Sequence, residues 1–305
     1  MKIKVEKKTT LTGHNGSVYT LDTGDEKHLI FSGSSDRIVT RWNLETLLPE
    51  NFAAKLPAIV YALCYVPEKK LLFAGTSSGN IHVLDLVKME EIKIMKHHMG
   101  PVFSIRYSPE TGCFYTGGGD GHFAICSLEN LSLIKFKKLC TEKIRNIDFN
   151  YQTSEIAVAS GDCQIRIFDL FSLEEKKVLN AHGLSANAVR FSPDGRYLLS
   201  GGRDAHLNTW DTNNYTKTSS IPAHNFAIYD IVFSPDGKLF ATASRDKTIK
   251  IWDATTFEML MRINKEKYEG HLNSVNKLIW SKYNNYLIST GDDRAIMVWE
   301  IIEIQ

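Results

Sequence analysis

One interval of 42 residues runs through this chain and constrains its fold more than any other feature. Positions 42, 84, 126, 168, 210 and 252 hold Trp42, Leu84, Cys126, Phe168, Trp210 and Trp252, and Trp299 follows 47 residues after the last of these. A repeat of about 40 residues is typical of folds that stack one small unit many times, because a single unit cannot bury both of its faces. The chain is therefore expected to be a repeat protein.

The copy around residue 240 predicts what the repeated unit is. An alternating run at 228–233 is followed by the turn Ser-Pro-Asp-Gly at 234–237, a second run at 239–243, a polar turn at 245–247 and a third run at 248–253. Pro at the second turn position fixes φ and Gly at the fourth permits the exit geometry, so this pattern predicts hairpins. A polar run such as 215–221 follows the column residue and is expected to be a fourth strand.

A second spacing is nested in the first. In five copies a His precedes an Asp by 22 residues, and that Asp lies six residues before the column position: His14 and Asp36, His98 and Asp120, His182 and Asp204, His224 and Asp246, His271 and Asp293. Because several columns agree at once, the chain resembles the WD-repeat (Trp-Asp repeat) β-propeller family over essentially its whole length. The resemblance implies an all-β fold, a single seven-bladed β-propeller of four-stranded antiparallel blades.

The same resemblance implies how the ring of blades is closed. Only six residues follow Trp299, too few for an outer strand, so the N-terminal strand at 2–12 is expected to pair with the last blade. We expect one domain over residues 1–305, with blade repeats at approximately 13–55, 56–96, 97–138, 139–180, 181–222, 223–269 and 270–305.

Each blade of this family contains a hydrogen-bonded set of His, Ser or Thr, Asp and Trp, called the tetrad below. The complete structural tetrads here are His14, Ser32, Asp36 and Trp42; His182, Ser200, Asp204 and Trp210; His224, Thr242, Asp246 and Trp252; and His271, Ser289, Asp293 and Trp299. Cys126 replaces Trp in the third copy, and the fourth has Cys140, Val158, Asp162 and Phe168. The second copy has Leu56, Ala74, Ser78 and Leu84, so its blade is expected to be held by packing alone. A hydrolase triad is not indicated, because such a triad occurs once and faces a cleft.

Partner binding is expected on the loops around one end of the propeller, the top face, where the resemblance places three columns of each blade. The candidate partner-binding residues in these columns are Tyr19, Tyr61, Phe103, Lys143, Arg145, Arg203, Tyr229 and Arg245. Aromatic and Arg side chains are enriched at interface hot spots, and Arg binds carboxylate or phosphate as a fork. We therefore expect a non-enzymatic protein–protein interaction scaffold whose protein or peptide partner carries acidic or phosphorylated groups.

Two alternatives stay open. An enzyme similar to a lactonase or lyase could use the channel mouth, although Asp292 is the only acid in the three columns. A subunit of a nucleic-acid-associated complex could use the basic residues, although 36 basic and 35 acidic residues nearly balance. No catalytic residue, metal or cofactor is expected, because the five cysteines lack a Cys-x-x-Cys spacing and the sequence has no His-Glu-x-x-His or Walker-type motif. We expect a cytoplasmic protein that does not bind membranes and is monomeric on its own.

Overall fold

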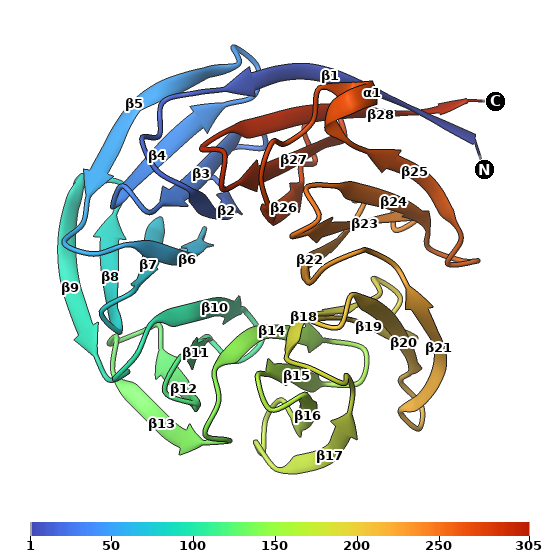
Figure 1. Cartoon of the computed structure of the whole chain (residues 1–305). Coiled ribbons are helices and arrows are strands. Elements are labelled where there is room, and N and C mark those ends of the chain that lie inside the picture. The colour runs from blue at the N-terminus through green and yellow to red at the C-terminus, as the bar shows by residue number, and fades with distance from the viewer. Residues whose placement is uncertain (1, 305) are drawn as a thin grey trace. The chain divides into compact units, whose positions relative to one another are not determined.

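The computed structural model describes residues 2–304, and apart from one short helix their regular secondary structure is all β-strand. They form seven four-stranded sheets, shown as sets of neighbouring arrows in Figure 1. The chain divides into two compact units, Met1–Val60 with His224–Gln305, and Tyr61–Ala223. The expectation of one domain over residues 1–305 stays a prediction.

The first unit contains three sheets. Their strands are β2 (Val18–Thr23), β3 (Leu29–Ser34), β4 (Ile38–Asn43) and β5 (Leu48–Lys55); β22 (Ile228–Phe233), β23 (Leu239–Ser244), β24 (Ile249–Asp253) and β25 (Met259–Ile263); and β26 (Val275–Trp280), β27 (Tyr286–Gly291), β28 (Ile296–Ile304) and β1 (Lys2–Leu11). The connection into the last sheet contains the short helix α1 (Lys265–Tyr268), capped by the Asn264 side chain.

The second unit contains the other four sheets, apart from the first residue of β6. Their strands are β6 (Val60–Val66), β7 (Leu71–Thr76), β8 (Asn80–Asp85) and β9 (Glu90–Lys96); β10 (Val102–Ser108), β11 (Cys113–Gly118), β12 (His122–Ser127) and β13 (Leu133–Lys138); β14 (Ile144–Asn150), β15 (Glu155–Ser160), β16 (Gln164–Asp169) and β17 (Glu175–Asn180); and β18 (Ala186–Phe191), β19 (Tyr197–Gly202), β20 (His206–Asp211) and β21 (Thr216–Pro222).

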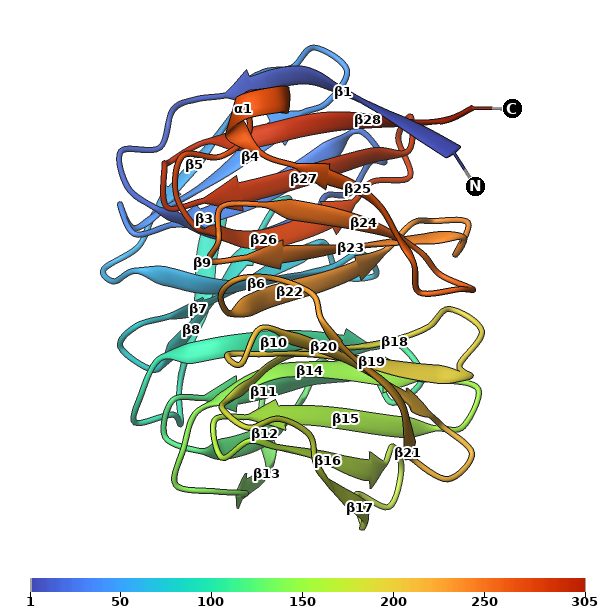
Figure 2. The same ribbon diagram turned by 45° about the vertical axis from the view of Figure 1, so that its right-hand side comes forward.

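The N-terminal strand completes the last sheet. Strand β1 pairs antiparallel with β28, from Lys2 opposite Ile304 to Leu11 opposite Ile296, and both views show the two strands side by side (Figures 1 and 2). Ile3 and Val5 are buried in one apolar cluster and Leu11 in another. The predicted fold class is therefore confirmed: an all-β chain of seven four-stranded antiparallel blades, with the N-terminal strand as the outer strand of the last one.

Turn chemistry follows the repeat as well. In the turn Ser-Pro-Asp-Gly at 192–195, Gly195 has φ of 72° and its N–H donates to the Ser192 carbonyl at 2.8 Å. Gly237 in the second copy of this turn has the same φ. Gly has no Cβ atom and adopts a left-handed φ at the lowest steric cost, which explains why Gly occupies the fourth position of both turns.

The 42-residue column lies between neighbouring sheets inside each unit. Trp42 packs in one cluster with Ile288 and Val298 of the last sheet, and Trp299 packs with Leu239 and Ile251 of the sheet before it. In the second unit Cys126 takes the same position beside Phe73. The column is therefore bulky or apolar because it fills the space between one sheet and the preceding one.

Candidate binding site

The four complete tetrads all form hydrogen-bonded chains. In the sixth blade, the His224 Nδ1 atom lies 2.9 Å from Asp246 Oδ2, and the Nε2 atom lies 2.8 Å from Thr242 Oγ1. The Trp252 indole N–H donates to the same hydroxyl oxygen at 3.0 Å. Equivalent chains link the members of the other three sets.

The pKa shifts of His224 and Asp246 determine which atoms of the sixth-blade tetrad carry protons. Burial lowers the pKa of His224, so this imidazole is neutral at pH 7. Burial also acts to raise the pKa of Asp246, but the hydrogen bonds that this carboxylate accepts from His224, Thr248 and the Asn225 N–H outweigh it and hold that pKa below its usual range. The neutral ring therefore donates from Nδ1 to the carboxylate and accepts from Thr242 at Nε2. Such a buried, satisfied network is a structural element, because its polar atoms face one another inside the blade.

The second blade is not held by packing alone, and that prediction was wrong. His82 of β8 is buried, and its Nδ1 atom lies 2.5 Å from Glu91 Oε2 on β9. In the sequence, His82 stands two positions before the column residue Leu84, and this position belongs to no member of the tetrad.

The fourth blade also has a polar network that the sequence analysis missed. The Arg166 guanidinium donates to Asp162 Oδ2 at 2.6 Å and to Ser160 Oγ at 2.9 Å, and Ser160 donates to Asp162 Oδ1 at 2.6 Å. Arg166 is buried and stands two residues before Phe168, in the same position as His82 in its own blade. In this blade a strand residue thus supplies the cation that compensates the turn carboxylate.

Four of the candidate partner-binding residues come together in the second unit. The rings of Tyr61 on β6 and Phe103 on β10 lie 5.3 Å apart between centroids. The Arg145 Cζ atom on β14 lies 4.8 Å from the Phe103 centroid, and the Lys143 Nζ atom lies 5.8 Å from it. We call these four residues the aromatic–basic cluster. Three consecutive blades supply it.

The four members of this cluster differ in exposure. Tyr61, Phe103 and Arg145 are half-buried, and Lys143 is exposed. A Cβ atom at Gly119 would lie 3.2 Å from the Phe103 ring and 2.9 Å from Pro101 Cδ, so the turn backbone packs closely behind this ring. Phe103 is therefore fixed in position, and two cations lie over its ring at distances suited to cation–π attraction.

The other candidates lie elsewhere. Arg203 is exposed at the turn between β19 and β20, and its N–H donates to the Ser185 carbonyl. In the first unit, Tyr19 and Tyr229 are half-buried on β2 and β22. The Arg245 Cζ atom lies 5.9 Å from the ring of Phe226, an exposed residue that the three columns did not include.

A metal site, a reactive cysteine and a membrane-spanning helix each require particular features of the described residues. Within residues 2–304, no group of three or more His, Cys, Asp or Glu side chains is placed to hold a metal ion. Burial raises the pKa of the Cys126 thiol to about 12, as for a core residue. None of the described helices has the length and hydrophobicity to span a membrane.

Seven small sheets with a repeated internal hydrogen-bond network define a repeat protein of the β-propeller class. The model of the family "WD domain, G-beta repeat" matches residues 5–43, 89–126, 173–211, 215–253 and 263–300, which together are more than half of the sequence, and the chain belongs to this family. The unmatched stretches contain the second and fourth column positions, Leu84 and Phe168, where the tetrad is replaced. No curated protein matches the chain significantly. Propellers of this family generally serve as protein-interaction scaffolds.

Proposed function

We propose that this protein is a non-enzymatic scaffold that binds a protein or peptide partner at the aromatic–basic cluster. The observation that carries the proposal is the Phe103 ring, which touches Tyr61 and lies under the cations of Arg145 and Lys143. Interface hot spots combine aromatic and Arg side chains in this way, because both give a large contact area at a modest loss of conformational freedom.

The charges define the ligand more closely. Lys143 is exposed and forms no ion pair with any carboxylate among residues 2–304, and the Arg145 guanidinium lies over the same Phe103 ring. A partner segment with an apolar anchor against Tyr61 and Phe103, followed by a carboxylate or phosphate, satisfies both parts of the cluster.

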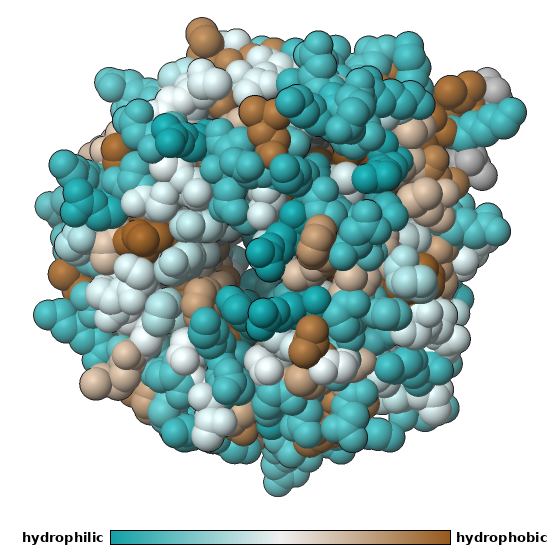
Figure 3. Space-filling model, viewed as in Figure 1, coloured by the Kyte–Doolittle hydropathy of each residue, from teal (hydrophilic) through white to brown (hydrophobic). Residues whose placement is uncertain are grey.

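Hydrophobicity on the face drawn in Figure 3 does not identify a better docking area. Figure 3 shows hydrophobic side chains scattered singly or in small groups among hydrophilic ones on the face viewed. Interfaces of non-obligate complexes are about as apolar as the rest of a protein surface, so composition of the contact residues is the better guide. The cytoplasmic location remains our expectation, because the sequence has an odd number of cysteines, five, and no Cys-x-x-Cys spacing.

The test is affinity capture from native lysate with three forms of the full chain, read by mass spectrometry. The double variant Tyr61→Ala, Arg145→Ala removes one aromatic and one cationic member of the cluster. The matched control is Tyr151→Ala, Arg196→Ala, which changes the same residue types at exposed positions outside the three columns. We expect a partner that is captured by the wild type and the control and lost with the cluster variant.

Two results sharpen or refute this expectation. Phosphatase treatment of the lysate is expected to abolish capture if the acidic group is a phosphate, and to leave it unchanged if the group is a carboxylate. Equal capture by the wild type and the cluster variant, with both equally resistant to urea, would show that the partner docks elsewhere.

A further inference from the structure

The last strand of the third sheet, β13, differs from its counterparts in the other sheets. Its sequence, LIKFKK, contains three apolar residues, and all three are exposed: Leu133 by 43%, Ile134 by 58% and Phe136 by 38%. In every other sheet, the strand at the corresponding edge has at least one apolar side chain that is buried or half-buried. Strand β13 therefore leaves its whole apolar content in contact with solvent.

This strand also has an unusual charge. It carries Lys135, Lys137 and Lys138 and no acidic residue, whereas β9 has two lysines and two glutamates and β5 has one of each. Among residues 2–304, no carboxylate forms an ion pair with any of the three lysines. The Lys137 Nζ atom lies 5.2 Å from the centroid of the Phe168 ring.

Register places two of the lysines apart from the apolar side chains. Leu133, Phe136 and Lys138 lie opposite Cys126, Ala124 and His122 of β12, and Lys135 and Lys137 lie opposite Ile125 and Phe123. Cross-strand partners share a face, and alternate residues of a strand point to opposite faces. Strand β13 thus presents an apolar face, formed by Leu133 and Phe136 and ending at Lys138, and a basic face formed by Lys135 and Lys137.

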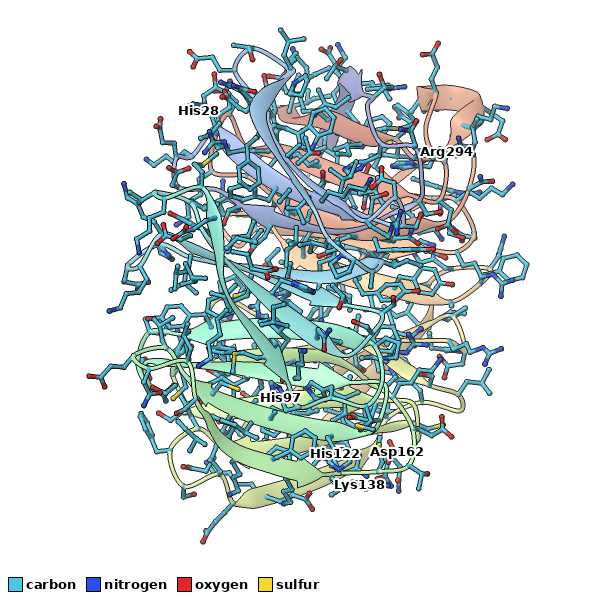
Figure 4. The ribbon with its side chains drawn as sticks, turned by 90° about the vertical axis from the view of Figure 1, so that its left-hand side faces the viewer. His28, His97, His122, Lys138, Asp162 and Arg294 are labelled. Atoms are coloured by element: carbon cyan, nitrogen blue, oxygen red, sulfur yellow. The ribbon has the colours of Figure 1, made fainter. Side chains whose placement is uncertain are left out.

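The apolar face is held rigidly. The Phe136 ring stacks on His122 of β12 at a centroid distance of 4.3 Å and an interplanar angle of 1°, and the rings of His97 and His98 lie within 5.9 Å. Figure 4 shows His122 and Lys138 close together on these neighbouring strands, with His97 nearby. A ring fixed in this way loses little conformational freedom when a partner covers it.

Strand β13 ends its sheet, with β12 as its one neighbour in the order β10-β11-β12-β13. An edge strand presents unpaired backbone N–H and C=O groups, and exposed apolar side chains on such an edge favour pairing with another chain. A second copy of β13 is a poor partner, because lysines would face lysines across the new pair.

We propose that β13 binds an extended segment of a partner protein by strand addition, and that acidic and apolar residues alternate in this segment. Its acidic residues lie opposite Lys135 and Lys137, and its apolar residues cover Leu133 and Phe136. This site is separate from the aromatic–basic cluster, so the two proposals stand or fall independently.

The test uses a fluorescein-labelled synthetic peptide of alternating Glu and Val residues, measured by fluorescence anisotropy with the full-length protein. There are three comparison peptides, each with one change. The first has Lys in place of Glu, the second has the same residues arranged in blocks, and the third has N-methyl groups on alternate amides. We expect the alternating acidic peptide to bind, binding to weaken with rising salt, and all three comparison peptides to bind at least about tenfold more weakly.

Protein variants locate the site. Lys135→Glu with Lys137→Glu is expected to weaken binding about tenfold, because two attractions become repulsions. The matched control, Lys55→Glu with Lys96→Glu, makes the same change of charge at exposed positions of β5 and β9 and is expected to change the affinity less than about twofold. Lys135→Glu alone spares the contact of Lys137 with Phe168 and is expected to weaken binding by about threefold.

Hydrogen exchange gives a readout that does not depend on any substitution. We expect the amides of residues 133–138 to become protected when the acidic peptide binds. No binding at 1 mM peptide, equal binding of the N-methylated peptide, equal losses for the test and control variants, or protection elsewhere without protection of 133–138 would each overturn the proposal.

Discussion

Replacing Thr242 by Val tests the physical role of the tetrad with almost no change of shape. Thr242 is fully buried, and its hydroxyl stands between the His224 Nε2 atom at 2.8 Å and the Trp252 indole N–H at 3.0 Å. Val fills the same volume but can neither donate to the imidazole nor accept from the indole. The substitution therefore removes hydrogen bonds while the packing stays as it was.

The expected cost follows from the two groups that lose their partner. An unsatisfied buried donor or acceptor costs about 1–3 kcal/mol, and both His224 and Trp252 are nearly inaccessible to water. We expect the free energy of unfolding to fall by about 3 kcal/mol. The measurement is equilibrium urea unfolding followed by circular dichroism. The variant Thr242→Ser keeps the hydroxyl and loses one methyl group, and is expected to cost only about 1 kcal/mol.

The fourth blade supplies the second half of this test. It has Val158 and Phe168 at the positions of Thr242 and Trp252, and both are buried. The double variant Thr242→Val, Trp252→Phe copies that arrangement and removes the orphaned indole, so its cost is expected to be at least about 1 kcal/mol below the sum of the single costs. A loss below about 0.5 kcal/mol for Thr242→Val, or strict additivity in the double variant, would refute this account of the tetrad.

Two further predictions concern acid and the N-terminal strand. Burial acts to raise the pKa of Asp204, but the hydrogen bond and charge of His182 and two backbone N–H groups outweigh it and hold this pKa at about 2, against an ordinary 3.8. The carboxylate therefore contributes stability above about pH 4 that is lost as the pH falls toward 2, by about 1 kcal/mol after allowance for its partial exposure. The free energy of unfolding, measured with urea at pH 6 and at pH 3, should drop correspondingly less for Asp204→Asn than for the wild type. Equal drops would contradict the stabilising role of this carboxylate. Deletion of residues 1–11 uncovers β28 and removes the buried Ile3, Val5 and Leu11, so we expect the melting midpoint to fall by several degrees in one cooperative transition, and an unchanged midpoint would contradict the closing role of β1.

Much of the fold could be predicted because its determinants are periodic. The turns at 192–195 and 234–237 specify hairpins locally, and the 42-residue column specifies what packs between sheets. The short tail after Trp299 left β28 without an outer neighbour, and residues 2–12 were the only unassigned strand. Each of these inferences needs spacing and residue type, which a sequence shows directly.

Contacts that depend on side-chain direction could not be predicted in the same way. His82 and Arg166 share a column with Thr40, Ala124, Asn208, Lys250 and Met297, so residue type in this column indicates no common role. Whether a long Arg side chain turns inward to Asp162 depends on the space left by Val158. In the aromatic–basic cluster the columns placed the residues, but only the structure shows that Arg145 and Lys143 share the ring of Phe103.

The blades that depart from the repeat are also those that carry both proposed binding surfaces. Tyr61 belongs to the second blade, Phe103 and β13 to the third, and Arg145 to the fourth, and none of these blades has a complete tetrad. In the fourth blade the pair of Arg166 with Asp162 satisfies the buried carboxylate, as the His of the tetrad does elsewhere. The third blade keeps the contacts of His98 with Asp120 and Thr116, and substitutions at Lys135, Lys137 or Phe103 change no member of the four complete tetrads. Loss of binding in such variants can therefore be separated from loss of fold.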